Sequence, residues 1–181
     1  TLLLLGPKEP GFWSAFTASP EWNDKRPDPM DRWSERVIGG MANALGGVAL
    51  FPFGGPPYQP FFQWALRSGQ AWQSPVTLLV HQKAGLMVSY RGALALRDRL
   101  VLPAVDPKPC ESCAKPCLTA CDARALTADG YDVPKCHAYL DTENGRENIM
   151  LGCGVRRSCP LSQSYGRLAE QSAYHMSLFH R

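Results

Sequence analysis

The sequence predicts an α+β protein with a small sheet-and-helix domain over residues 1–105 and a cysteine-rich module over residues 106–181. The first observation is that short apolar runs alternate with segments of helical periodicity before the boundary, which is typical of a small sandwich of sheet and helices. The second is that all seven cysteines lie in residues 110–159. Hydrophobic residues make up 45% and charged residues 19% of the chain, which favours a compact protein over a disordered one.

The boundary between the two parts is the stretch "LPAVDPKP", residues 102–109. Its prolines, Pro103, Pro107 and Pro109, lack backbone N–H donors and favour extended conformations. The stretch is therefore typical of a connector that leads into the cysteine-rich module.

The first half of the N-terminal domain begins with "LLLL" at residues 2–5, which predicts a buried strand, and a short helix is expected over residues 10–18. A longer helix is predicted within residues 28–47, because apolar side chains recur there at steps of three and four residues before a glycine pair ends the pattern. Those apolar positions are Met30, Trp33, Val37, Met41 and Leu45.

The second half of the domain begins with the strand-like run "VALF" at residues 48–51. Two glycines, followed by the three prolines Pro56, Pro57 and Pro60, then precede an aromatic run, which predicts a rigid turn opening a helix near Pro60. We favour a packed aromatic turn over a ligand loop here, because the glycine pair is not part of a strand-to-helix phosphate fingerprint. Three further strands are expected in "SPVTLLVHQ", "GLMVSYRGAL" and "DRLVLP".

Charge and hydropathy narrow the function classes. The net charge of +3 is mild, and the basic residues do not form a stripe, so nucleic-acid binding is not supported. The longest aliphatic run has four residues, far short of the ~20 needed to cross a bilayer. The first residues also lack the pattern of a secretory signal. We therefore expect a protein of the cytoplasm, where thiols stay reduced.

The density of cysteines in "CESCAKPCLTACD", residues 110–122, allows three interpretations. A disulfide framework is disfavoured, because the count is odd and the cysteine-free half is hydrophobic enough to fold alone. Structural zinc could use Cys110 and Cys113 as one knuckle, but Cys153 and Cys159 are spaced too far apart for the second. Iron–sulfur ligation fits best, because a tight loop with a cysteine at every third or fourth residue can wrap the corners of a cubane.

The ligands of such a cluster can be assigned by the logic of bacterial ferredoxins, in which the fourth cysteine of the run serves another cluster and a remote cysteine completes the first. The remote ligand is expected to be Cys159, which is followed by proline. The expected first [4Fe–4S] set is Cys110, Cys113, Cys117 and Cys159. The remaining cysteines, Cys121, Cys136 and Cys153, form a second and incomplete set.

Three segments, "CESCAKPCLTACDARAL", "YDVPKCHAYLDTE" and "LGCGVRRSCP", resemble the ferredoxin-like module of the epoxyqueuosine reductase family, in matching order over residues 109–160. The reductases are corrinoid-dependent iron–sulfur enzymes that act on a modified tRNA base. The chain is also similar to short bacterial ferredoxin-like proteins that carry an aromatic-rich N-terminal region. The resemblance implies a ferredoxin-like fold for the module and one or two [4Fe–4S] clusters.

The chain departs from the family's pattern at the thiols themselves. One extra residue separates Cys113 from Cys117, and Asp122 stands where the family has proline. The family also has a further cysteine between those matching Cys153 and Cys159, and this chain has none there. The second set therefore lacks one ligand. It is expected to hold a cluster with one iron open to water, substrate or another ligand, with His137 in reserve, or no cluster.

Other conspicuous residues have ordinary explanations. His175, Met176 and His180 lie in a segment of helical spacing, which favours a docking C-terminal helix over a haem or copper site. Arg156 and Arg157 could raise the potential of a nearby cluster, attract an acidic redox partner, or simply serve solubility.

The function expected from these observations is electron transfer to or from a redox partner protein. The first alternative, which the resemblance implies, is a reductase that passes electrons to a corrinoid or flavin in residues 1–105. The second alternative is a zinc-stabilised interaction module. No catalytic residue could be assigned from the sequence.

Overall fold

The computed structural model describes residues 1–102, 104–105 and 107–181, and the chain is of mixed α and β structure with 42% helix and 12% strand. The mixed class predicted from the sequence is confirmed, and the sheets are small. The chain forms two compact units. The sheet unit comprises Thr1–Ser68 and Ser89–Val105, and the thiol unit comprises Gly69–Val88 and Asp106–Arg181.

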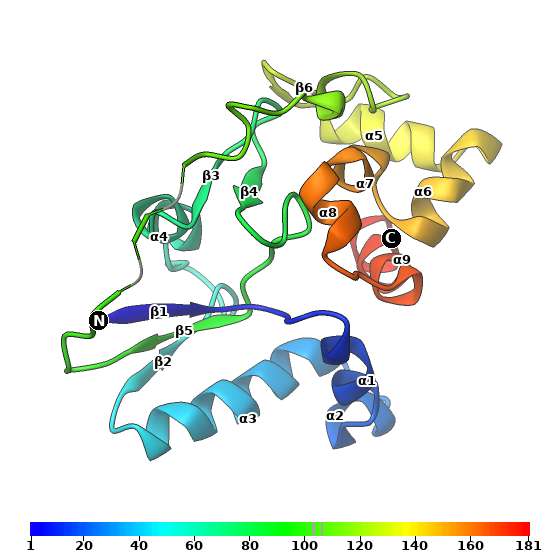
Figure 1. Ribbon diagram of the computed structural model, residues 1–181. Helices are drawn as coiled ribbons and strands as arrows, with labels where there is room; N and C mark the ends of the chain where they lie inside the picture. Colours follow the sequence, from blue (N-terminus) through cyan, green and yellow to red (C-terminus); the bar gives the residue numbers. More distant parts are fainter. Residues whose placement is uncertain (103, 106) are drawn as a thin grey trace. The chain divides into compact units, whose positions relative to one another are not determined.

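The sheet unit is built on an antiparallel three-stranded sheet with the order β1-β5-β2 (Figure 1). The strands are β1 (Leu2–Leu5), β2 (Val48–Leu50) and β5 (Gly92–Ala95). The long helix α3 (Pro29–Ala44) lies along this sheet and packs Ile38 and Ala42 against Leu94. Gly92 permits this close approach, because a Cβ at that position would lie 2.6 Å from the Ile38 side chain. The predicted helix is confirmed, but the face that covers the sheet is not the one expected, because Met41 and Leu45 of the predicted pattern are exposed.

An aromatic cluster joins α3 to the short helices α1 (Gly11–Thr17) and α2 (Pro20–Asn23). Phe16 is fully buried, and its ring meets Trp22 and Trp33 edge to face with centroid distances of 5.1 and 6.0 Å. Aromatic pairs in this arrangement add to the free energy gained by burying the rings. The unit also contains α4 (Phe61–Arg67), which begins immediately after Pro60 as the sequence predicted.

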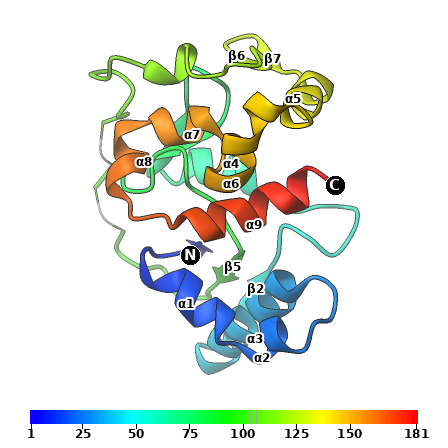
Figure 2. The same ribbon diagram turned by 90° about the vertical axis from the view of Figure 1, so that its right-hand side faces the viewer.

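The thiol unit combines a hairpin from the middle of the chain with the whole cysteine-rich region. In the hairpin, β3 (Ala71–Gln73) pairs antiparallel with β4 (Leu79–His81). The cysteine-rich region contains the 3₁₀ turn η1 (Pro116–Leu118), the two-stranded ribbon of β6 (Leu126–Thr127) and β7 (Gly130–Tyr131), and a set of short helices. These are α5 (Val133–Leu140), the 3₁₀ turn η2 (Glu143–Gly145), α6 (Arg146–Leu151), α7 (Gly154–Ser158), α8 (Pro160–Ser164) and α9 (Ala169–Phe179). The C-terminal helix α9 packs along α6 (Figure 2).

Two expectations from the sequence differ from the structure. No strand forms over residues 98–102, and Pro103 of that predicted strand lies outside the described residues. The side chains of Leu100, Val101 and Leu102 are exposed, and the N–H of Leu100 bonds the Thr1 hydroxyl rather than a neighbouring strand. Apolar residues alone cannot make a strand without a partner to pair with. The hairpin of residues 69–88, placed in the N-terminal domain from the sequence, packs within the thiol unit.

Among the helices of the described residues, none is long and apolar enough to cross a membrane.

An ion pair between the buried Glu21 and the exposed Arg36 should make the stability of the sheet unit sensitive to acid. The Glu21 carboxylate accepts hydrogen bonds from Arg36 at 2.5 and 3.0 Å, and these lower the pKa of Glu21 from 4.5 to about 2. A carboxylate with a lowered pKa stabilises the fold above its unfolded pKa, and this contribution is lost as the pH falls from 4.5 towards 2. We expect Glu21→Gln to weaken the pH dependence of the free energy of unfolding between pH 4.5 and 2. Urea unfolding followed by tryptophan fluorescence measures this dependence.

The matched control for this experiment is Glu35→Gln, which removes an exposed carboxylate from α3, the helix that carries Arg36. Because Glu35 lies in solvent, the control should keep the acid dependence of the wild type. Equal acid dependence of Glu21→Gln and the wild type would show that the ion pair contributes nothing to stability.

Candidate metal centre

All seven cysteines lie in the thiol unit as free thiols. Cys117 is buried, and the other six are half-buried. Cys110 and Cys113 precede η1, Cys117 lies within it, and Cys121 follows it. The remaining three come from the helical part: Cys136 from α5, and Cys153 and Cys159 from the two ends of α7. The thiols are therefore carried by loops and helix ends, where the backbone can turn around a bound group.

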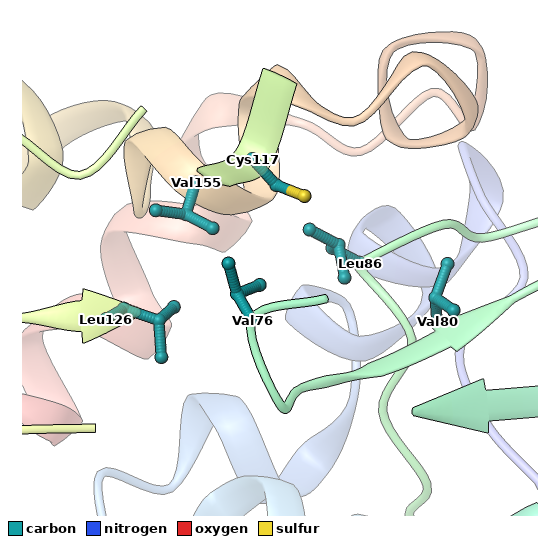
Figure 3. Packing of buried hydrophobic residues seen from close by; sticks show 6 residues of the cluster. All are labelled: Val76, Val80, Leu86, Cys117, Leu126 and Val155. Carbon is teal, nitrogen blue, oxygen red and sulfur yellow. The ribbon is translucent and has the colours of Figure 1, made fainter. Parts of the chain in front are cut away.

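One apolar core holds these loops in place (Figure 3). It consists of six buried side chains drawn from the hairpin, η1, β6 and α7, namely Val76, Val80, Leu86, Cys117, Leu126 and Val155. The half-buried thiols of Cys110, Cys121, Cys153 and Cys159 pack against this core. Burial of thiols beside aliphatic side chains disfavours their charged form, so the core also shapes the chemistry of the site.

The first set of thiols is Cys110, Cys113, Cys117 and Cys159, and the pKa values of Cys110 and Cys117 are affected by other thiols of the set. Burial raises the pKa of Cys110, and the neighbouring Cys113 and Cys159 raise it further. Burial is also the largest cause of the raised pKa of Cys117, and the other three thiols of the set raise this pKa further. Lys108 and Lys115 act in the opposite direction on Cys110. A bound cation would offset the repulsion that raises the pKa values of Cys110 and Cys117.

The hairpin supports this first set through Gly85. Gly85 has a φ of +55°, and a Cβ there would lie 3.0 Å from the Cys159 sulfur and 2.5 Å from the Ser162 nitrogen. The next residue, Leu86, donates its N–H to the Ser162 hydroxyl at 2.9 Å and accepts a hydrogen bond from Arg156 at its carbonyl. A residue without a side chain is therefore needed where the hairpin loop passes Cys159.

The second set of thiols is Cys121, Cys136 and Cys153. Burial raises the pKa of Cys136, a hydrogen bond from Tyr131 lowers it, and Cys153 and Cys121 raise it. The Cys121 sulfur accepts the N–H groups of Ala125 and Leu126 at 3.3 and 3.4 Å. The two sets have the same members as the ligand sets inferred from the spacing, and iron ligation by either set stays a prediction.

The donor chemistry of both sets fits a cluster of soft metal ions. The sets contain thiols, with backbone N–H groups directed at the Cys113 and Cys121 sulfurs, and thiolates are the ligands that iron–sulfur clusters use. Within residues 1–102, 104–105 and 107–181, no three His, Cys, Asp or Glu side chains converge as ligands of one ion do. A cubane places each thiolate on a different iron, so its ligands stand farther apart than those of a single tetrahedral ion.

His137, the reserve ligand inferred from the sequence, contacts the C-terminal helix. Its Nδ1 lies 2.7 Å from the Nδ1 of His180, and its ring stacks on Phe179 with a centroid distance of 4.6 Å. His180 in turn bonds Asp141 at 3.0 Å. The C-terminal helix predicted around His175, Met176 and His180 is confirmed as α9, with His180 just beyond its end.

Sequence reasoning missed two residues of the site, Tyr131 and Gly85. Tyr131 directly precedes the helix that carries Cys136, but nothing in its spacing marks it as a partner of a thiol. Gly85 approaches Cys159 from a segment 74 residues away along the chain. Only the packing of the hairpin reveals that contact.

Comparisons with protein families, curated proteins and solved structures found no match to this chain.

Substitution of Gly85 should damage the first set specifically. Gly85→Ala introduces a methyl group 2.5 Å from the Ser162 backbone and places alanine at a left-handed φ. We expect the steric clash to lower the free energy of unfolding of the thiol unit by about 1–3 kcal/mol, as overpacking does, in addition to the cost of the left-handed conformation. We also expect the variant to bind less iron after reconstitution. Urea unfolding and iron analysis measure the two effects.

Gly46→Ala is the control, because Gly46 has a similar φ of +60° with nothing within 4 Å of the added Cβ. It imposes the left-handed strain without the steric clash. Equal losses of stability in the two variants, with equal iron content, would show that the approach of Gly85 to Cys159 is unimportant.

Proposed function

We propose that this protein is an electron-transfer protein that carries a [4Fe–4S] cluster on Cys110, Cys113, Cys117 and Cys159. The observation that carries the proposal is the grouping of three thiols from one short loop with a remote fourth thiol: Cys110 and Cys159 pack against the core that contains Cys117, and the other three thiols all raise the pKa of Cys117. When bound, the cluster would delocalise one electron over iron and sulfide with little rearrangement.

The electrostatics of the first set support a cationic occupant. Burial and mutual repulsion hold the pKa values of Cys110 and Cys117 above that of a free thiol. Binding to metal ions reverses this, because a coordinating thiol loses its proton outright. The set is thus disfavoured as bare thiolates and favoured as a ligand set.

The residues around the first set would tune the reduction potential of a bound cluster and exclude water from it. Val76, Leu86 and Val155 form an apolar wall beside Cys117, and a dry environment lowers the local dielectric constant. The N–H of Lys115 lies 3.3 Å from the Cys113 sulfur, where it would offset negative charge on that thiolate.

Charge near the first set indicates the kind of partner. Lys108 and Lys115 lie close enough to Cys110 to affect its pKa, and Lys115 is exposed beside the exposed Leu118. A basic and partly apolar surface beside the cluster suits an acidic redox partner protein. Arg157, considered from the sequence for this role, instead bonds Glu147 at 2.8 Å and the Gly152 carbonyl at 3.0 Å.

Metal and sulfide analysis of anaerobically purified protein tests the proposal. We expect about four irons and about four sulfides at the first set, and a brown absorption spectrum. Cys110→Ser or Cys159→Ser should remove about four irons, because a hydroxyl is a poor replacement for a soft thiolate on iron. Cys136→Ser is the control, since it leaves the first set intact. Stoichiometric zinc without sulfide would overturn the proposal in favour of a zinc-stabilised module.

Removal of the cluster should loosen the hairpin as well as the cysteine loops. The hairpin shares its apolar core with Cys117, so ordering of the cysteine loops and of residues 69–88 should be coupled. Hydrogen exchange after iron chelation should show lost protection in β3 and β4 together with residues 110–159. The amides of α3, in the sheet unit, should keep theirs. A hairpin that stays protected would show that its packing does not depend on the cluster.

A further inference from the structure

A hollow in the surface of the thiol unit lies where the chain passes from α8 to α9. Its volume of about 340 Å³ is within the range of sites that hold small molecules. The polar part of its lining includes two guanidinium groups and two hydroxyl groups, from Arg157, Arg167, Ser162 and Ser172. Among the described residues, no acidic side chain belongs to the lining. We call this site the arginine hollow, and its donors and charge favour an anion.

The side chain of Ser172 points to a ligand in the arginine hollow. Ser172 is only 5% exposed, and in the part of the chain that the structure describes its hydroxyl bonds no other group. Buried polar groups in folded proteins nearly always have a hydrogen-bond partner, because an unpaired group has lost its water without compensation. Since Ser172 lines the hollow, a ligand oxygen bound there would supply that partner.

The start of α9 adds backbone donors to the same site. The helix has eleven residues, and Leu168 at its N-cap has no side-chain oxygen to accept the first N–H groups. Ala169, the first helical residue, lines the hollow. Unpaired N–H groups and the helix dipole both favour negative charge at this end. Glu170, the acidic residue of the first turn, is exposed and does not belong to the lining.

The two guanidinium groups are held in place by bonds to other parts of the thiol unit. Arg157 donates from Nε to the Gly152 carbonyl at 3.0 Å and from Nη2 to Glu147 at 2.8 Å, which leaves Nη1 to donate elsewhere. The Glu147 side chain is 65% exposed, so water screens its attraction for Arg157. Arg167 donates to the Met87 carbonyl at 3.0 Å. These bonds orient both groups before any ligand binds.

Ser162 brings the hollow close to the first set of thiols. Its hydroxyl oxygen accepts the N–H of Leu86 at 2.9 Å, and its own O–H proton stays available for another acceptor. The Ser162 oxygen and the Cys159 sulfur both lie within 3.0 Å of the position that a Cβ on Gly85 would take. A ligand in the arginine hollow would therefore bind beside Cys159.

We propose that the arginine hollow binds the phosphate group of a small organic molecule. Its donors come from α7, α8, α9 and the segment between α8 and α9, and the oxygens of a phosphate group accept bonds from more directions than the two oxygens of a carboxylate. Met87 and Leu151 add apolar surface to the lining, which suits the organic part of the ligand. The inference goes beyond the proposed function, because phosphate binding needs no cluster.

Equilibrium dialysis of the anaerobically purified full chain against radiolabelled inorganic phosphate tests the site. We expect saturable binding to the wild type, and a dissociation constant about tenfold higher in Ser172→Ala, as follows from the loss of one hydrogen bond to a charged group. Ser177→Ala is the matched control, because Ser177 lies on the same helix and its hydroxyl bonds the Tyr174 carbonyl at 2.8 Å. This control should bind phosphate as the wild type does.

A second variant tests the charge of the hollow without altering a buried residue. Gln163 is exposed and lines the hollow, so Gln163→Glu places a carboxylate there with little change of shape. We expect it to raise the dissociation constant for phosphate at least about tenfold through repulsion. Gln73→Glu adds the same charge at an exposed position of β3 that does not line the hollow, and it should leave binding unchanged. Far-UV circular dichroism checks that each variant is folded.

Three results would overturn the inference: no saturable binding of phosphate to the wild type, equal affinity in the wild type and Gln163→Glu, or equal affinity in the wild type and a folded Ser172→Ala. Displacement of phosphate by acetate at equal concentration and ionic strength would also overturn it, since the site would then take any anion. Iron and sulfide analysis of the same samples judges the proposed function separately. Phosphate binding to a chain without iron would overturn that function and support this inference.

Discussion

The packing of the hairpin against the cysteine loops is the constraint on which the thiol unit depends. Residues 108–125 contain no regular structure beyond the short turn η1, so backbone hydrogen bonding alone does not fix their path. Leu86 joins the hairpin to the helical part through three contacts: its side chain lies in the core, its N–H bonds Ser162, and its carbonyl accepts from Arg156. Arg167 adds a further bond to the Met87 carbonyl at 3.0 Å. These contacts connect residues 70 to 80 positions apart, and so hold the thiols from loop and helices together.

The same packing creates an electrostatic problem that ligand binding would solve. Burial and mutual repulsion raise the pKa values of Cys110, Cys117 and Cys136, so the thiol unit favours neutral thiols when it holds no cation. Metal binding releases those protons and converts repulsion between thiolates into attraction towards a shared cationic centre. Folding of the cysteine loops and filling of the sites are therefore expected to be linked.

The elements that could be predicted from the sequence are those fixed by local patterns. The helix over Pro29–Ala44 has a strong apolar period, and α4 begins directly after Pro60, so local residues suffice to identify both. The expected strand at residues 98–103 illustrates the limit, because its described residues have no neighbouring strand to pair with. Division of the thiols into two sets was expected from the ferredoxin pattern, in which the fourth cysteine of the run serves another cluster and a remote cysteine completes the first, and it stays a prediction.

The features that the sequence could not reveal arise from contacts between distant segments. The position of Gly85 beside Cys159 depends on how the hairpin packs, and the hairpin was assigned to the other domain because its sequence contains no cysteine. Tyr131 is near in sequence to Cys136, but its relation to Cys121 follows from the pairing of Leu126 with Tyr131. This register is set by two strands of only two residues each, which are too short to show an alternating hydrophobic pattern in the sequence.

The two sets are joined by short stretches of backbone, which bears on how electrons would move between them. Cys153 and Cys159 stand at opposite ends of α7, a helix of five residues, which at a rise of ~1.5 Å per residue spans roughly 8 Å. Cys117 and Cys121 form a second link between the sets. Lys108 and Lys115 beside the first set and Arg156 beside the second would each offset the negative charge of a bound cluster, so the two sets need not differ in charge compensation.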